Sequence, residues 1–154
     1  DQDRTKWDRE LIGLADRYLQ RAAHGTELTA YHVEAAIASV HANAPSFTGT
    51  DWPTIVGLYD RLLALSPSAI VRFNRAIALA QAKGAADGLA ELERVDGLER
   101  SHLYHAARAE LLRALGRADD AQEAFTKAHS LARSPKEREL LDRKNERGGA
   151  VLDG

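Results

Sequence analysis

The chain has 154 residues, and its 21 basic and 23 acidic side chains give a formal net charge of -2 at pH 7. This length suits one domain with an ordinary hydrophobic core, and the lack of excess positive charge argues against direct binding of nucleic acid. There is no cysteine, which excludes disulfides, thiolate metal sites and a cysteine nucleophile.

Composition also indicates the compartment. A chain without cysteine fits the reducing cytoplasm, and no apolar run approaches the roughly 20 residues that a membrane span needs. We therefore expect a cytoplasmic protein with no membrane partner. The sequence contains no methionine, so we also expect it to be a piece of a longer protein.

The first half of the chain shows apolar residues at helical spacing. The spacing predicts helices over residues 7–22, 29–42, 52–66 and 68–82. Thr29 is a plausible cap for the second helix, and Asp51 for the third, whose first turn tolerates Pro53. Residues 43–51, NAPSFTGTD, are rich in loop-forming residue types and predict the longest loop.

The second half continues with the same periodicity. It predicts helices over residues 86–94, 103–115, 118–132 and 135–144. Ser134 and Glu137 have the spacing of a capping box, with Pro135 at the first helical position. No run alternates with a two-residue period, so the chain is expected to be all-α.

The stretch Leu111–Pro135 indicates how these helices are arranged. Gly116 closes one helix, and Ala121 and Phe125 form the A-x-x-x-F step of a second, as in tetratricopeptide repeats. The 32 residues from Gly84 to Gly116 are close to the length of one such repeat. We expect a tetratricopeptide-like stack of antiparallel helical hairpins over residues 1–147, with an N-terminal helix, a C-terminal capping helix, and a flexible tail over 148–154.

A stack of this kind presents one helix of each hairpin on a concave surface, where a peptide or another domain can bind. The positions expected to face this surface are Glu34, His41, Asn74, Gln81, Glu110 and Arg113. Asn74 is the strongest candidate, because an asparagine within a helix has lower helix propensity than its neighbours. It is expected to hydrogen-bond across helices or to a backbone. The alternative is that all six are ordinary solvated positions.

Catalysis is not indicated. His102 and His105 lie three residues apart on a predicted helix, a spacing that can hold a metal, but no carboxylate follows one turn later. Neither a G-x-S-x-G motif nor a P-loop occurs. We expect no enzyme activity, metal or cofactor. Trp52 either anchors the loop before it or forms an exposed binding hot spot, and the anchor is the favoured interpretation.

Five strings carry a family resemblance. They are QDRTKWDRELI, AYHVEAAIASVHA, TDWPTIVGLYDRLLALSPSAIVRFNRAIALA, YHAARAELLRALGR and ERELLDR. In this order they resemble the C-terminal extension of the bacterial extracytoplasmic-function (ECF) sigma factors associated with YCII-related (DGPF) proteins. The resemblance implies a regulatory domain that controls transcription initiation in cis. Its partners would be the sigma domains of the same polypeptide or the RNA polymerase core.

The same resemblance implies which residues matter. Matching positions are Asp3, Arg4, Trp7, Asp51, Trp52, Asn74, Arg75 and Arg108. Promoter DNA would be bound only by N-terminal sigma domains that are expected to precede this chain. One departure is that Thr29 and Ala30 stand where a Gly-Pro pair is expected. The alternative function is a stand-alone tetratricopeptide adaptor that binds a peptide or a partner protein.

Overall fold

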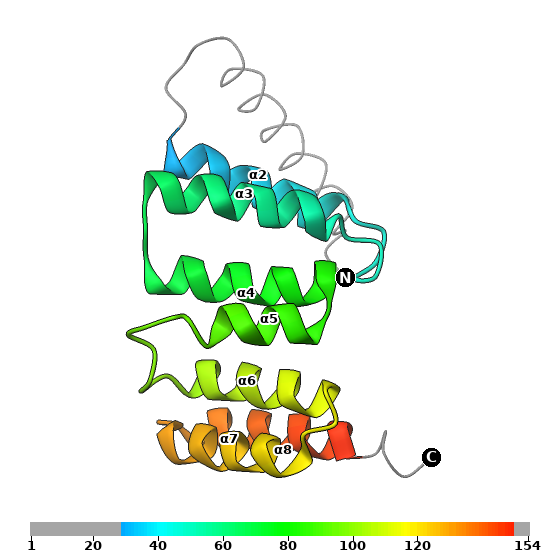
Figure 1. The fold of residues 1–154 in the computed structure, drawn as a ribbon, viewed down its shortest axis with the longest axis vertical. Coiled ribbons are helices and arrows are strands. Elements are labelled where there is room, and N and C mark those ends of the chain that lie inside the picture. The colour runs from blue at the N-terminus through cyan, green and yellow to red at the C-terminus, as the bar shows by residue number, and fades with distance from the viewer. Residues whose placement is uncertain (1–28, 150–154) are drawn as a thin grey trace. The chain divides into compact units, whose positions relative to one another are not determined.

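The structure, a computed structural model, describes residues 29–149, and this part of the chain is entirely helical (Figure 1). The helices are α2 (Ala30–Asn43), α3 (Trp52–Leu65), α4 (Ala69–Lys83), α5 (Ala85–Leu92), α6 (His102–Ala114), α7 (Ala118–Leu131) and α8 (Pro135–Gly149). The prediction of an all-α chain is confirmed for residues 29–149. The helix predicted over 7–22, with Asp3, Arg4 and Trp7, lies outside the described residues.

The chain divides into two compact units, residues 1–78 and 79–154. Unit one contains α2, α3 and most of α4. Unit two contains the end of α4 and the helices α5 to α8.

Helix ends follow the predicted capping chemistry. Asp51 precedes α3 and its carboxylate accepts a hydrogen bond from the Thr54 backbone N–H at 3.1 Å. The Ser134 N–H donates to the Glu137 carboxylate, and the Glu137 N–H donates to the Ser134 hydroxyl, both at 3.2 Å. The capping box is therefore confirmed. The expected end of the last helix near Lys144 is wrong, since α8 continues to Gly149.

The helix starts recur with a period of 33 residues. Helices α3, α5 and α7 begin at residues 52, 85 and 118, and helices α4, α6 and α8 begin at 69, 102 and 135. A serine precedes each helix of the second set, and its hydroxyl accepts from a backbone N–H three residues later. These serines are Ser68, Ser101 and Ser134. The chain thus repeats one helical hairpin, including its caps.

The core of unit one lies between α2 and α3. Its buried residues are Val33, Ile37, Ile55, Leu62 and Ala78. On α4, the fully buried positions are Ala76 and Ala78, whereas the larger residues of the predicted face are only partly buried. The predicted stripe of Phe73, Ile77 and Ala80 is therefore not the buried one. Small side chains occupy the most enclosed positions of this helix.

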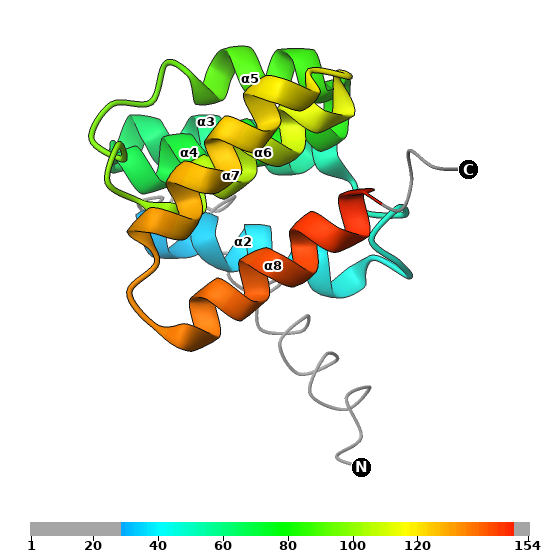
Figure 2. The ribbon, with the colours of Figure 1, turned by 90° about the horizontal axis from the view of Figure 1, so that it is seen from below.

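Unit two is built around the contact of α6 with α7, and α8 packs against both (Figure 1 and Figure 2). The main cluster consists of Leu89, Ala109, Leu112, Ala121, Ala124 and Phe125. Three alanines in this set let the helix axes approach closely around one aromatic ring. A smaller cluster, Ala106, Ala128, Ala132 and Leu141, holds α8.

Two glycines end helices where the sequence predicts that helices stop. Gly84 follows α4 with φ of 113°, and Gly116 closes α6 with φ of 74°. These are backbone conformations that favour glycine, because a Cβ would clash with the chain. Both predicted helix ends are confirmed.

Candidate interaction surfaces

Two of the predicted binding residues are arginines that make ion pairs within the chain. Arg75 Nε on α4 lies 2.6 Å from Asp60 Oδ1 on α3. Arg108 Nη2 on α6 lies 3.0 Å from Glu93 Oε1, just after α5. Each pair joins residues 15 apart, and the second pair lies 33 residues after the first. Both arginines therefore link consecutive helices.

Two further predicted residues, Glu110 and Arg113 on α6, contact the last helix. Glu110 Oε1 lies 2.9 Å from Lys144 Nζ. The guanidinium of Arg113 donates to Asn145 Oδ1 at 2.9 Å and lies over the Phe125 ring at 4.6 Å. The structure brings these two residues together at α8, so their side chains help to hold that helix in place.

Trp52 lies among aromatic neighbours at the start of α3. It is half-buried and packs against the unit-one core. Its ring meets His41 of α2 at 5.3 Å and Phe47 of the preceding loop at 5.1 Å, both edge-on. This packing agrees with the anchor interpretation of Trp52. It also gives the exposed His41 a contact within the chain.

The remaining predicted positions lie on helix surfaces. Glu34 on α2 and Gln81 on α4 are exposed, and Asn74 on α4 is half-buried. Within residues 29–149, the Asn74 side chain makes no hydrogen bond, so the expected bond across helices is not observed there. Its amide therefore remains accessible to a ligand or partner.

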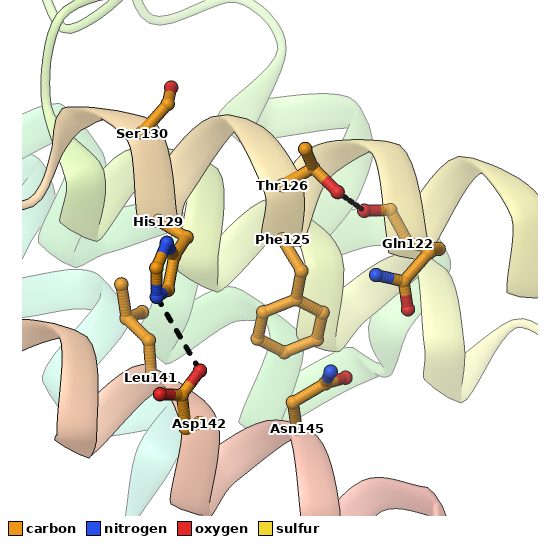
Figure 3. Close-up of a pocket in the computed structure, with 8 residues that line it drawn as sticks. All are labelled: Gln122, Phe125, Thr126, His129, Ser130, Leu141, Asp142 and Asn145. Atoms are coloured by element: carbon orange, nitrogen blue, oxygen red, sulfur yellow. Dashed lines mark hydrogen bonds and ion pairs between the residues drawn. The ribbon is translucent and has the colours of Figure 1, made fainter.

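A pocket of about 320 Å³ lies between α7 and α8 (Figure 3). Phe125 and Leu141, both nearly fully buried, supply its apolar part. His129 Nε2 and Asp142 Oδ1 face each other across it at 3.6 Å (Figure 3). The other lining residues are Gln122, Thr126, Ser130 and Asn145. The pocket combines an aromatic ring with polar groups that can donate or accept hydrogen bonds.

A wider hollow of about 750 Å³ lies beside α6 and α7. Its charged lining has both signs, with Arg108 and Lys127 against Asp119 and Glu123. His105 also lines it, and His105 Nε2 lies 2.8 Å from the backbone oxygen of Glu99. A lining of this kind suits a polar stretch of polypeptide better than an apolar small molecule.

The third hollow, about 420 Å³, belongs to unit one. It lies where the end of α2, the loop and the start of α3 meet, and its polar groups include Ser39, Asn43 and Asp51. The Thr54 side-chain hydroxyl and then the Thr54 backbone N–H hold the pKa of Asp51 below its usual value. The Asp51 carboxylate therefore serves the helix cap.

Burial and hydrogen bonding perturb a few other groups. Burial raises the pKa of Tyr59 and of Tyr104. The backbone N–H of Gly97 lowers the pKa of Glu99, and that of Arg133 lowers the pKa of Glu137. The lowered carboxyl groups accept backbone hydrogen bonds at turns and helix starts. These shifts therefore reflect local structure rather than paired acid and base groups.

Metal and membrane sites were sought among the described residues. Residues 29–149 contain no group of three or more histidine, aspartate or glutamate side chains that could hold a metal ion. His102 and His105 therefore have no carboxylate or histidine completing a site in this range. Over the same range, no helix is both long and apolar enough to cross a bilayer.

Comparison with known proteins gives one relative. No family model matches the chain, and no solved structure matches it. The chain is 38% identical over 138 residues to an uncharacterized protein of Rhizobium meliloti (strain 1021). The match covers 89% of this chain and 33% of that protein. The chain thus spans about a third of the length of the curated relative that it matches.

Sequence reasoning missed the partners of the predicted side chains. Asp60 and Glu93, which pair with Arg75 and Arg108, were not among the candidates. A signal was present, because both pairs have the same separation and recur with the helix period. Lys144 and Asn145, which contact α6, gave no such signal, since α8 differs from the earlier helices at the equivalent positions.

Proposed function

We propose that this chain is a regulatory protein–protein interaction domain of an ECF sigma factor, built as a tetratricopeptide-like stack. The observation that carries the proposal is the 33-residue recurrence of helix starts and serine caps. Repeated helical hairpins of this length form tetratricopeptide and related solenoids, which bind other polypeptides on extended surfaces. The period supports a binding role in preference to catalysis.

The sigma-factor part of the proposal rests on the resemblance of the five strings and on the length of the relative. In the Rhizobium meliloti protein the matched region occupies 33% of the length, so further sequence accompanies it. In the proposed arrangement, such sequence includes the sigma domains that bind promoter DNA and polymerase. The present domain would act in the cytoplasm and would contact those sigma domains or the polymerase core.

The polar residues of α4 are the proposed contacts. Asn74 has an accessible amide, and Gln81 is exposed on the same helix. Arg75 and Arg108 contribute indirectly in this proposal, because their ion pairs set the spacing of consecutive helices. Glu34 supplies an exposed carboxylate on α2.

The test is transcription by purified polymerase core with the full-length protein that contains this chain. Removal of residues 29–149 is expected to change the yield from the cognate promoter, while polymerase binding by the sigma domains persists. Asn74→Ala should reproduce part of the change, and Arg94→Ala, at an exposed position, should not. Unchanged transcription without residues 29–149 would contradict the proposed regulation.

A stand-alone adaptor is the second candidate, favoured by the hollow with mixed charges beside α6 and α7. It predicts binding of a peptide by the isolated chain. Lys127→Glu, which reverses one charge of the hollow, should weaken that binding. A panel of peptides of varied charge, titrated against wild type and Lys127→Glu, distinguishes the two candidates. Absence of any binding would remove the adaptor.

A further inference from the structure

Helix α8 is attached to the rest of unit two by few apolar contacts. Nine of its 15 residues are charged, and its two large apolar side chains are Leu140 and Leu141. Leu141 is 5% exposed, whereas Leu140 is 51% exposed. One leucine therefore supplies most of the apolar burial on this helix.

The surface under α8 combines an apolar floor with a polar rim. Leu141 packs on the floor, which consists of Ala106, Ala128 and Ala132. The rim residues each meet one polar side chain of α8. These contacts are His129 with Asp142 at 3.6 Å, Glu110 with Lys144 at 2.9 Å, and Arg113 with Asn145 at 2.9 Å.

Comparison with α6, which begins 33 residues earlier, shows what α8 lacks. In α6, Ala109 and Leu112 are fully buried. The equivalent positions of α8 are Asp142 and Asn145, whose contacts are polar. Exposed ion pairs contribute little to stability, and salt screens them. Helix α8 should therefore open more readily than α6 or α7.

We propose that α8 is a detachable helix on a helix-docking surface, and that a helix of a partner protein with the same side-chain pattern can replace it. The docking surface consists of Ala106, Ala128 and Ala132 with the rim residues Glu110, Arg113 and His129. The partner helix carries a leucine followed directly by an acidic residue. A lysine and an amide follow three and four positions after the leucine.

Charge complementarity supports this kind of occupant. The acidic residue of the partner faces His129, its lysine faces Glu110, and its amide faces Arg113, as Asp142, Lys144 and Asn145 do in α8. Only residues 132–134 connect α7 to α8. Opening at this connection leaves α6 and α7 in contact with each other. The proposal concerns α8 alone and does not depend on a sigma-factor role.

The first experiment uses the full chain with Leu141→Asp, which removes the leucine anchor of its own α8. A fluorescent peptide with the sequence of residues 134–147 is titrated against this variant and against wild type. The peptide is expected to bind the variant at least ten-fold more tightly, because wild-type α8 occupies the surface. A second change, Arg113→Ala, should weaken that binding.

Two peptide variants provide matched controls. A peptide with Leu140→Asp should bind as the original does, whereas one with Leu141→Asp should not bind. Equal binding to wild type and variant, or no binding to a Leu141→Asp chain that retains its helical circular dichroism, would overturn the proposal. A wild-type dimer that the peptide dissociates would show that a second copy fills the surface, and would overturn the assignment to a partner.

The second experiment covers the case in which Leu141→Asp does not fold. Hydrogen exchange of the wild-type chain is measured at low and high salt. Amides of α8 are expected to exchange at least ten-fold faster than the most protected amides of α6 and α7, and faster still at high salt. Equal protection of α8, α6 and α7, with no dependence on salt, would overturn the proposal.

Discussion

Arg75 Nε lies 2.6 Å from the carboxylate of Asp60, and this contact joins α3 to α4. The side chain of Arg75 is 20% exposed and that of Asp60 is 54% exposed. The pair is thus partly shielded from water on one side. Its counterpart, Arg108 with Glu93, occupies the equivalent place one repeat later.

The first prediction is that Arg75→Ala lowers the free energy of unfolding by about 1 kcal/mol. A partly buried charged hydrogen bond is lost, but solvent around Asp60 limits the cost. Chemical denaturation followed by circular dichroism measures the change. Arg94→Ala is the control, because Arg94 is 79% exposed and lies 3.8 Å from Glu91. If Asp60→Ala and Arg75→Ala were additive in a double mutant, the two residues would not be coupled.

Much of the fold could be predicted from local sequence. Asp51, Ser134 and Glu137 cap helices at the predicted places, because a cap depends on residues within one turn. The end of α8 was missed, since Gly148 and Gly149 are residue types typical of a tail. The buried positions of α4 were missed too. Ala76 and Ala78 are enclosed because of tertiary packing, which helical spacing alone does not reveal.

The candidate site was harder to predict for a related reason. The partners of Arg108 and Arg113 lie 15 and 32 residues away in the sequence. A helical pattern shows which residues share a face but not which side chain of another helix meets them. Polar residues expected to await a partner therefore prove to link helices of the same chain.

The second prediction concerns the closest approach between α4 and α5. A Cβ added to Gly88 would lie 2.7 Å from Ala80 Cα and closer still to Ala80 Cβ. Gly88→Ala should therefore destabilise the chain by about 1–3 kcal/mol through overpacking. The midpoint of denaturation measures the effect.

Gly57 in α3 is the matched control for Gly88. A Cβ at Gly57 meets nothing within 4 Å, so Gly57→Ala should stabilise the chain by about 0.5–1 kcal/mol, because alanine is the better helix former. A Gly88→Ala variant as stable as Gly57→Ala would show that α4 and α5 are farther apart than described.

The third prediction is a pH dependence from the cap of α8. The backbone N–H of Arg133 holds the pKa of Glu137 below its ordinary value of 4.5. A lowered pKa in the folded state adds stability that is present above pH 4.5 and is lost as pH falls through the folded-state pKa. Glu137→Gln should therefore destabilise α8 at pH 7, and the difference from wild type should shrink in acid.

Hydrogen exchange of the first turn of α8 at pH 7, with denaturation midpoints between pH 7 and 3, measures this difference. Glu146→Gln is the control, since Glu146 is an exposed residue of the same helix outside its first turn. A gap between wild type and Glu137→Gln that stays constant down to pH 3 would contradict the assigned role of the Glu137 carboxylate.

The fourth prediction concerns the loop anchored by Trp52. The ring of Phe47 covers Trp52 edge-on at 5.1 Å, and aromatic pairs of this kind contribute about 0.5–1.5 kcal/mol. Phe47 is mostly exposed, so Phe47→Ala should lower the free energy of unfolding by about 0.5 kcal/mol, at the lower end of that range. It should also shift the fluorescence of Trp52 to longer wavelength, because water reaches the indole.

The measurement needs the fluorescence of Trp52 alone. The chain has two tryptophans, so Trp7→Phe provides the background for all variants. Ile70→Ala is the control, since Ile70 is as exposed as Phe47 but belongs to α4. Its emission should match that of the background. An unchanged emission maximum for Phe47→Ala would mean that the loop does not cover Trp52 in solution, and Trp52 would then be the stronger candidate for a binding hot spot.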